Sequence, residues 1–148
     1  MRGDELPEED RIVRYLSATM IDDDGSADGA GFCLRRGETG LSVNWLDVLA
    51  SEGTDPLNEV RRLSRLRLRR SGRFAELGVG DVLRAVTEEL DTLRIVHDPL
   101  EAAEGFAADP SHSQITGLPP VDTDEAMLVG DIIAECATAM HPAVVEPS

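Results

Sequence analysis

The chain has 148 residues and a formal net charge of −15, and 41% of its residues are hydrophobic. This length fits one domain with its own core and is short for two domains. Nucleic acid and anionic lipid surfaces are poor partners for such an acidic chain. No stretch reaches the roughly 20 apolar residues of a membrane span, and the opening MRGDELPEED is charged where a signal peptide is apolar. We therefore expect a cytoplasmic protein.

The N-terminal third predicts a tail, an ambiguous segment and a loop. Residues 1–10 contain a proline and many charges, which predicts a mobile acidic tail before one ordered domain over residues 11–142. RIVRYLSATMI, residues 11–21, fits a short strand and a helical turn about equally well. The glycines and aspartates of residues 22–31 indicate a loop.

Two short segments around the turn RGETG predict a β-hairpin. GFCLRR (31–36) and LSVNWL (41–46) place Phe, Val and Trp where strands favour them, and WLDVLA (45–50) allows a helical turn afterwards. In the second strand, alternation turns either Asn44 or Trp45 inward, and we expect the tryptophan in the core.

Three helices are predicted from capping residues that precede apolar residues at helical spacing. They begin near Pro56, Asp81 and Thr123, and they end near Arg70, at Leu90 and before Pro142. The first combines an aspartate cap with a proline at the first helical position, where proline is well tolerated.

The remaining strands complete the predicted fold. FAELGV (74–79) is a weak strand candidate, LRIVH (93–97) reads as a buried strand, and QITGL (114–118) is its expected neighbour. We therefore predict a single α+β domain, in which a small mixed or antiparallel sheet of GFCLRR, LSVNWL, LRIVH and QITGL is packed by about three helices. Residues 143–148 form a C-terminal tail in this prediction.

Three segments of the chain carry a resemblance to other proteins. GETGLSVNWLDVL, VHDPL and DPSHSQITGLP resemble segments of a group of small uncharacterised bacterial proteins that carry them in the same order. The resemblance spans most of residues 31–140. It implies that the three segments belong to one fold, and it implies no activity, because none is known for the group.

The best candidate for a catalytic site combines two histidines. His97 and Asp98 stand at the end of the LRIVH strand, and Ser111 and His112 stand just before QITGL. Histidine moves protons near neutral pH and an aspartate can fix its tautomer, so general-base or nucleophilic catalysis is one interpretation. Two histidines and an aspartate also suit zinc, although no metal-ligand spacing is present. A solvated connection whose histidines cap turns is the favoured interpretation.

The acidic loop invites a calcium interpretation. Asp24, Ser26, Asp28 and Gly29 match the first, third, fifth and sixth positions of an EF-hand loop. The twelfth position must supply a bidentate carboxylate but is Arg35, so we favour a turn-rich surface loop. We expect no metal.

Arginines are concentrated in one segment. All 14 basic residues are arginine, and seven of them lie in RRLSRLRLRRSGR, residues 61–73. Guanidinium groups bind phosphates bidentately, which makes this segment a candidate ligand-binding element. Neutralisation of neighbouring carboxylates is the favoured alternative, because the segment lacks the aromatic residues that stack on bases. The candidate ligand-binding residues are Arg61, Arg62, Arg65 and Arg69.

The function suggested by these observations is coarse. The common nucleotide-binding, metalloprotease and hydrolase signatures are absent from the sequence, and no cofactor is expected. Cys33 and Cys136 have no partner spacing and read as buried thiols in a reducing compartment. The leading hypothesis is a non-enzymatic protein-interaction or accessory module of a bacterial cytoplasmic system. The alternative is a small enzyme or ligand-binding domain for a phosphate-bearing or nucleotide-like substrate that uses His97 and His112.

Overall fold

The computed structural model describes residues 2–51 and 53–145, and within them six strands form one open sheet in the order β4-β5-β2-β1-β3-β6. Every neighbouring pair is antiparallel. The strands are β1 (Arg11–Leu16), β2 (Gly40–Trp45), β3 (Arg73–Gly78), β4 (Arg94–His97), β5 (His112–Thr116) and β6 (Ala139–Pro142). The α+β class predicted from the sequence is confirmed.

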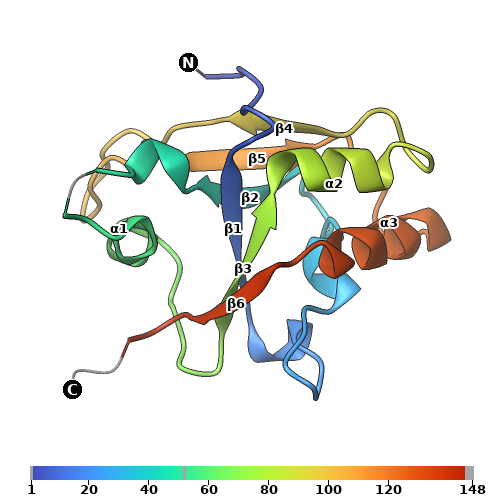
Figure 1. The fold of residues 1–148 in the computed structure, drawn as a ribbon, viewed down its shortest axis with the longest axis horizontal. Coiled ribbons are helices and arrows are strands. Elements are labelled where there is room, and N and C mark those ends of the chain that lie inside the picture. Colours follow the sequence, from blue (N-terminus) through green and yellow to red (C-terminus); the bar gives the residue numbers. More distant parts are fainter. Residues whose placement is uncertain (1, 52, 146–148) are drawn as a thin grey trace.

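The helices lie on both sides of this sheet (Figure 1). They are α1 (Pro56–Leu63), α2 (Val79–Val86) and α3 (Asp124–Glu135), with short 3₁₀ helices η1 (Ala18–Met20), η2 (Gly29–Phe32) and η3 (Asp47–Leu49). Alternation along β1 divides the core: Ile12 packs with α2, α3 and η2, whereas Val13 packs with α1. We call these the α2–α3 face and the α1 face of the sheet.

The prediction of a first hairpin strand at residues 31–36 is wrong. GFCLRR (31–36) is not a strand, because Gly29–Phe32 forms η2, which packs tightly against α3. Two glycines allow that contact: a Cβ on Gly130 would lie 2.5 Å from the Gly29 carbonyl oxygen, and one on Gly29 would lie 2.0 Å from Asp131 Oδ1. The hairpin prediction used residue preferences alone, and tertiary packing overrides them here.

All three predicted helices end earlier in the structure than the sequence suggested. The first ends at Leu63 rather than near Arg70, because the backbone of Ser64 turns to an extended conformation (ψ 135°). The second begins at Val79 rather than Asp81, directly after β3, and ends at Val86 rather than Leu90. The third begins near Thr123 as expected, and the Thr123 hydroxyl accepts a hydrogen bond from the backbone N–H of Ala126, but the helix ends at Glu135 rather than just before Pro142.

Three strands of the sheet were predicted only weakly or not at all. RIVRYL is the strand β1, and the weak candidate FAELGV is β3, so these two strands hold central positions in the sheet. Strand β6 is a correction, because most of its residues AMHP were assigned to the end of the third predicted helix, whereas in the structure they pair with β3.

The chain ends are packed on the domain where the structure describes them. The N-terminal segment, expected as a mobile tail, lies along β4: Gly3 N donates to His97 O at 2.7 Å, and Leu6 is buried. Ala143, placed in the expected C-terminal tail, is buried beside α1, and residues 146–148 of that tail lie outside the described residues. No helix of the described part of the chain is both long enough and apolar enough to span a bilayer.

Candidate functional site

The sheet opens between β1 and β2, and Arg14 fills the opening. The two strands pair only at Ile12↔Trp45 and Val13↔Asn44, after which they diverge. The Arg14 guanidinium spans the gap: Nε donates to Gly31 O at 2.6 Å, and Nη1 donates to Ser42 O at 2.7 Å. The pKa of Arg14 is lowered to about 10, mainly by burial, with Glu38 opposing the decrease and Arg35 adding to it.

A pocket of about 520 Å³ lies over this opening on the α1 face. Its walls come from β1, β2, β5, the segment after α1 and the connection between β4 and β5. The lining residues are Arg14, Tyr15, Ser17, Met20, Arg35, Glu38, Ser42, Asn44, Ser64, Arg65, Leu66, Leu100, Asp109 and His112.

The three arginines of this pocket lack carboxylate partners among the described residues. Arg14 donates to carbonyl oxygens, Arg65 does the same, and Arg35 Nη2 lies 3.8 Å from the sulfur of Met20. Elsewhere on the molecule ion pairs are formed by Arg2, Arg11, Arg62, Arg84 and Arg94. The pocket therefore gathers three guanidinium groups without a close carboxylate partner, although the side chains of Glu38 and Asp109 also belong to its lining.

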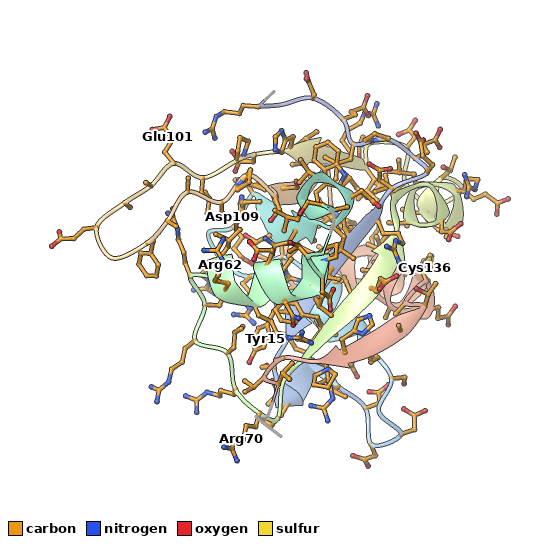
Figure 2. All side chains as sticks on the ribbon, turned by 60° about the vertical axis from the view of Figure 1, so that its left-hand side comes forward. Tyr15, Arg62, Arg70, Glu101, Asp109 and Cys136 are labelled. Carbon is orange, nitrogen blue, oxygen red and sulfur yellow. The ribbon has the colours of Figure 1, made fainter. Side chains whose placement is uncertain are left out.

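Arg65 joins the pocket to an exposed hairpin of residues 100–109. Its Nη2 donates to Glu101 O at 2.5 Å and Ala107 O at 3.2 Å, and its guanidinium lies 5.4 Å from the centre of the Phe106 ring. Figure 2 shows this hairpin projecting from the body, with Asp109 near its base and Glu101 partway along the other arm. The Nε of Arg65 is buried and has no hydrogen-bond partner among the described residues.

A buried polar network forms the floor of the pocket. Asp109 is 3% exposed, and its carboxylate accepts hydrogen bonds from Asn44 Nδ2 at 3.1 Å and from Ser111 Oγ at 2.7 Å. Asn44 Nδ2 also donates to Ser111 Oγ at 2.9 Å. Ser111, a candidate catalytic residue from the sequence, is thus fully buried in a structural network.

His112 lies beside a different serine. Its Nδ1 is 2.8 Å from Asp98 O, and its Nε2 is 3.2 Å from Ser42 Oγ. A carbonyl oxygen only accepts, so Nδ1 carries the proton in the neutral ring and Nε2 accepts from the Ser42 hydroxyl. The Asp98 carboxylate oxygen Oδ2 lies 3.6 Å from the same Nδ1.

Asp98 is itself held by two side chains. Gln114 Nε2 donates to Asp98 Oδ2 at 2.8 Å, and Arg2 donates to Asp98 Oδ1. The register of β2 and β5 pairs Ser42 with Gln114 and Asn44 with His112, so all four side chains share one face. The sequence suggested Asp98 as the group that orients a histidine, and the structure places it beside His112.

The second histidine does not join this group. His97 pairs with Ser113 across β4 and β5, so it faces the opposite side of the sheet from His112. There its ring meets Trp45 edge to face at 5.2 Å, and its Nε2 donates to Pro110 O at 2.6 Å. Trp45 lies on the α2–α3 face as expected and packs against the core there. The structure therefore does not bring the two histidines together.

The arginine-rich segment divides into separate roles. Arg61 donates to Pro142 O, Arg62 pairs with Glu59, and the backbone N–H of Arg69 donates to the Tyr15 hydroxyl. Of the four arginines proposed from the sequence, Arg65 alone is among the pocket residues. Arg62 is the member that neutralises a neighbouring carboxylate, as the alternative interpretation expected.

Sequence reasoning missed Arg14 and Arg35 as candidates, and it did not single out Ser42. One signal was present: in RIVRYL, an arginine stands between Ile12 and Leu16 on the alternation that faces the α2–α3 core. A charge at a core-facing position must be compensated by hydrogen bonds or an opposite charge, which marks the residue as unusual.

The acidic loop behaves as a turn. Asp24 Oδ1 accepts from Ser26 N at 3.0 Å and from Ser26 Oγ at 2.6 Å, which lowers the pKa of Asp24. Among the described residues, no group of three or more His, Cys, Asp or Glu side chains is arranged to hold a metal ion.

No family model, curated protein or solved structure matches the chain. The resemblance to small bacterial proteins stated from three sequence segments therefore stays an expectation.

Proposed function

We propose that this protein is a ligand-binding domain whose pocket on the α1 face holds a small phosphate-bearing molecule. One observation carries the proposal: Arg14, Arg35 and Arg65 line one pocket, and none of them forms an ion pair with a carboxylate of the described chain. Guanidinium groups without close carboxylate partners keep their charge and their donors available for an anion, and they outnumber the two acidic residues of the lining, Glu38 and Asp109.

The arrangement of the donors supports an anionic ligand. Arg14 is fixed by two carbonyl oxygens, so its guanidinium is already oriented and little side-chain entropy remains to be lost on binding. A phosphate oxygen that reaches Arg65 Nε would satisfy a buried donor that has no hydrogen-bond partner among the described residues. Guanidinium groups bind phosphate with paired, charge-assisted hydrogen bonds.

The size and walls of the pocket suit more than an inorganic ion. A volume of about 520 Å³ lies within the range of small-molecule sites. Tyr15, Leu66 and Leu100 supply apolar surface, and Ser17 and Ser64 supply hydroxyl groups at the lining. A nucleotide-like molecule, with one anionic end and one ring, fits this combination.

Calorimetric titration with inorganic phosphate and with pyrophosphate tests the proposal. We expect the wild-type protein to bind both, and Arg14→Met and Arg65→Met each to weaken binding about tenfold or more, the loss of one charged hydrogen-bonding group. Arg67→Met is the matched control, because Arg67 is exposed on the same segment and does not line the pocket. Equal affinity in all four proteins would contradict the proposal.

A protein-interaction module of a bacterial cytoplasmic system is a second proposal, favoured by the surface beside the pocket. Leu66 is 57% exposed and Phe106 is 46% exposed, on either side of Arg65. Exposed apolar side chains next to arginines are typical of interfaces. Affinity capture with the wild-type protein and with a Leu66→Ser, Phe106→Ser variant, at low and high salt, tests it: a partner retained equally by both proteins would contradict this surface.

A further inference from the structure

We propose that Ser42 is a nucleophile and that this pocket hydrolyses carboxylic esters whose acid or alcohol part carries an anionic group. The proposal rests on the proposed ligand site, since Arg35 and Arg65 would hold that anionic group. It adds a reaction and three residues with distinct roles: Ser42 attacks, His112 moves the proton and Asp98 positions His112.

The geometry of these three residues carries the inference. Ser42 Oγ is exposed to the pocket and 3.2 Å from His112 Nε2, within reach of proton transfer. His112 Nδ1 is fixed by Asp98 O at 2.8 Å and lies 3.6 Å from the Asp98 carboxylate. A serine, a histidine and an aspartate in this order are recognised as a catalytic set by geometry rather than by sequence spacing.

The surroundings hold this set in place. The His112 side chain is 15% exposed and the Asp98 side chain is 23% exposed, so solvent reaches both groups only in part. Gln114 Nε2 donates to Asp98 Oδ2 at 2.8 Å, and Ser42 and Gln114 are direct partners across β2 and β5. Rigid strands therefore position the serine and the histidine, which favours a preorganised site.

Other serines of the pocket do not have this arrangement. Ser17 Oγ lies 3.1 Å from Thr19 Oγ1, and Ser64 Oγ accepts from the backbone N–H of Leu66 at 3.2 Å. Ser111 is buried against Asp109. Within the described residues, Ser42 is the serine whose hydroxyl lies within hydrogen-bond distance of a histidine nitrogen.

Arg14 is bound to the backbone of the nucleophile's own residue. Its Nη1 donates to the carbonyl oxygen of Ser42 itself at 2.7 Å, which fixes the guanidinium beside the attacking residue. We assign Arg14 to the negative charge that develops on the ester carbonyl oxygen, because a preoriented cation in a partly dry site stabilises such an oxyanion strongly.

The reaction balances with water as the second substrate. Ser42 Oγ forms a bond to the ester carbonyl carbon as its proton passes to His112 Nε2, and the carbonyl electron pair moves onto oxygen. Collapse breaks the bond to the alcohol oxygen, which takes the proton from His112, and Ser42 is left acylated. Water then adds to the acyl carbon with His112 as base, and collapse releases the carboxylic acid and restores the Ser42 hydroxyl.

A fluorophosphonate probe tests the nucleophile without knowledge of the natural substrate. The Ser42 oxygen forms a bond to phosphorus, the phosphorus–fluorine bond breaks, and fluoride leaves while His112 takes the proton. We expect intact mass spectrometry of the wild-type chain to show one probe per molecule, and peptide mapping to locate it on Ser42. An unlabelled chain, or a label on another residue, overturns the proposal.

Four variants sharpen the test. Ser42→Ala should abolish labelling, and His112→Gln should slow it about 100-fold or more, because general-base catalysis is lost. Ser71→Ala, an exposed serine in the turn before β3, and His97→Gln, a histidine on the opposite face, should label at the wild-type rate. Ser42→Ala changes an exposed side chain and should fold normally, which circular dichroism checks, so its result is decisive even if His112→Gln is unstable.

The two proposals can fail separately. Phosphate binding without labelling of Ser42 would overturn the nucleophile and leave the ligand-binding function intact. Labelling of Ser42 without affinity for phosphate or pyrophosphate would overturn the anion site and leave the nucleophile standing.

Discussion

The two faces of the sheet are built from the same strands but have different chemistry. On the α2–α3 face, side chains such as Ile12, Leu77 and Ile115 are fully buried under two helices. On the α1 face, one short helix covers only part of the surface, and Ser42, Asn44 and His112 line the uncovered pocket. The α2–α3 face holds the larger apolar cluster and so contributes more to stability. The α1 face can therefore hold polar groups that would be costly in an apolar core.

The largest loss of stability is expected from a substitution in the core of the α2–α3 face. Ile12→Ala removes a side chain that is 0% exposed in the centre of the sheet, so it should lower the free energy of unfolding by about 2–5 kcal/mol. Urea denaturation measures this value. Ser42→Ala, on the opposite face, should change stability by less than about 0.5 kcal/mol. Similar losses in the two variants would mean that the faces do not divide stability and function.

A second prediction concerns the glycine contact that replaces the predicted hairpin strand. In Gly130→Ala the new Cβ would lie 2.5 Å from Gly29 O and 2.8 Å from Cys33 Sγ, so α3 must move away from η2. We expect a loss of about 1–3 kcal/mol, typical of overpacking. Thermal melting of Gly130→Ala measures this loss, and a melting temperature equal to that of the wild type would contradict the close contact between α3 and η2.

This glycine contact also shows where reasoning from sequence reaches its limit. The spacing of Leu57, Val60 and Leu63 predicts α1 because it depends only on neighbours along one helix. The contact between Gly29 and Gly130 joins residues about a hundred positions apart, and no local preference encodes it. Class and helix positions were therefore predictable, whereas η2 and β6 were not.

The candidate site shows the same limit. The sequence singled out His112 and Asp98 because histidine and aspartate are chemically conspicuous, and the structure places them together. It could not identify Ser42 or Arg14, because their roles follow from the register of β2 with β5 and from the opening between β1 and β2. A serine in a strand has no special signal until its cross-strand neighbours are known.

Arg14, which reaches from β1 into the pocket, should make phosphate affinity depend on pH. Its pKa of about 10 means that it is charged at neutral pH and loses its charge as the pH rises beyond that value. Phosphate affinity should therefore be constant from pH 8 to 9 and fall about tenfold per pH unit above 10. In Arg14→Met the affinity should be weak and flat over the same range.

A phenol in the same pocket requires a control for this pH dependence. Tyr15 is the single tyrosine of the chain and lines the pocket, so Tyr15→Phe is the matched control variant. In Tyr15→Phe the fall in phosphate affinity should remain, if Arg14 causes it. Isothermal titration at each pH decides between the two groups, because a flat profile in Tyr15→Phe would assign the effect to the phenol.

The smallest expected effect is on the reactivity of the two cysteines, which lie on the α2–α3 side of the sheet. Burial raises the pKa of Cys33, with Asp131 and Asp28 adding to the increase, and burial raises the pKa of Cys136, with Asp81 and Glu135 adding to it. The reactive species of cysteine is the thiolate, so a raised pKa leaves less of it at pH 8. Both thiols should react with a disulfide reagent more slowly than free cysteine at pH 8, and the rates should converge in urea, where burial is lost. Reaction of either thiol at the free-cysteine rate in the folded protein would contradict the raised pKa values, because both side chains are partly exposed and need no opening of the fold to react.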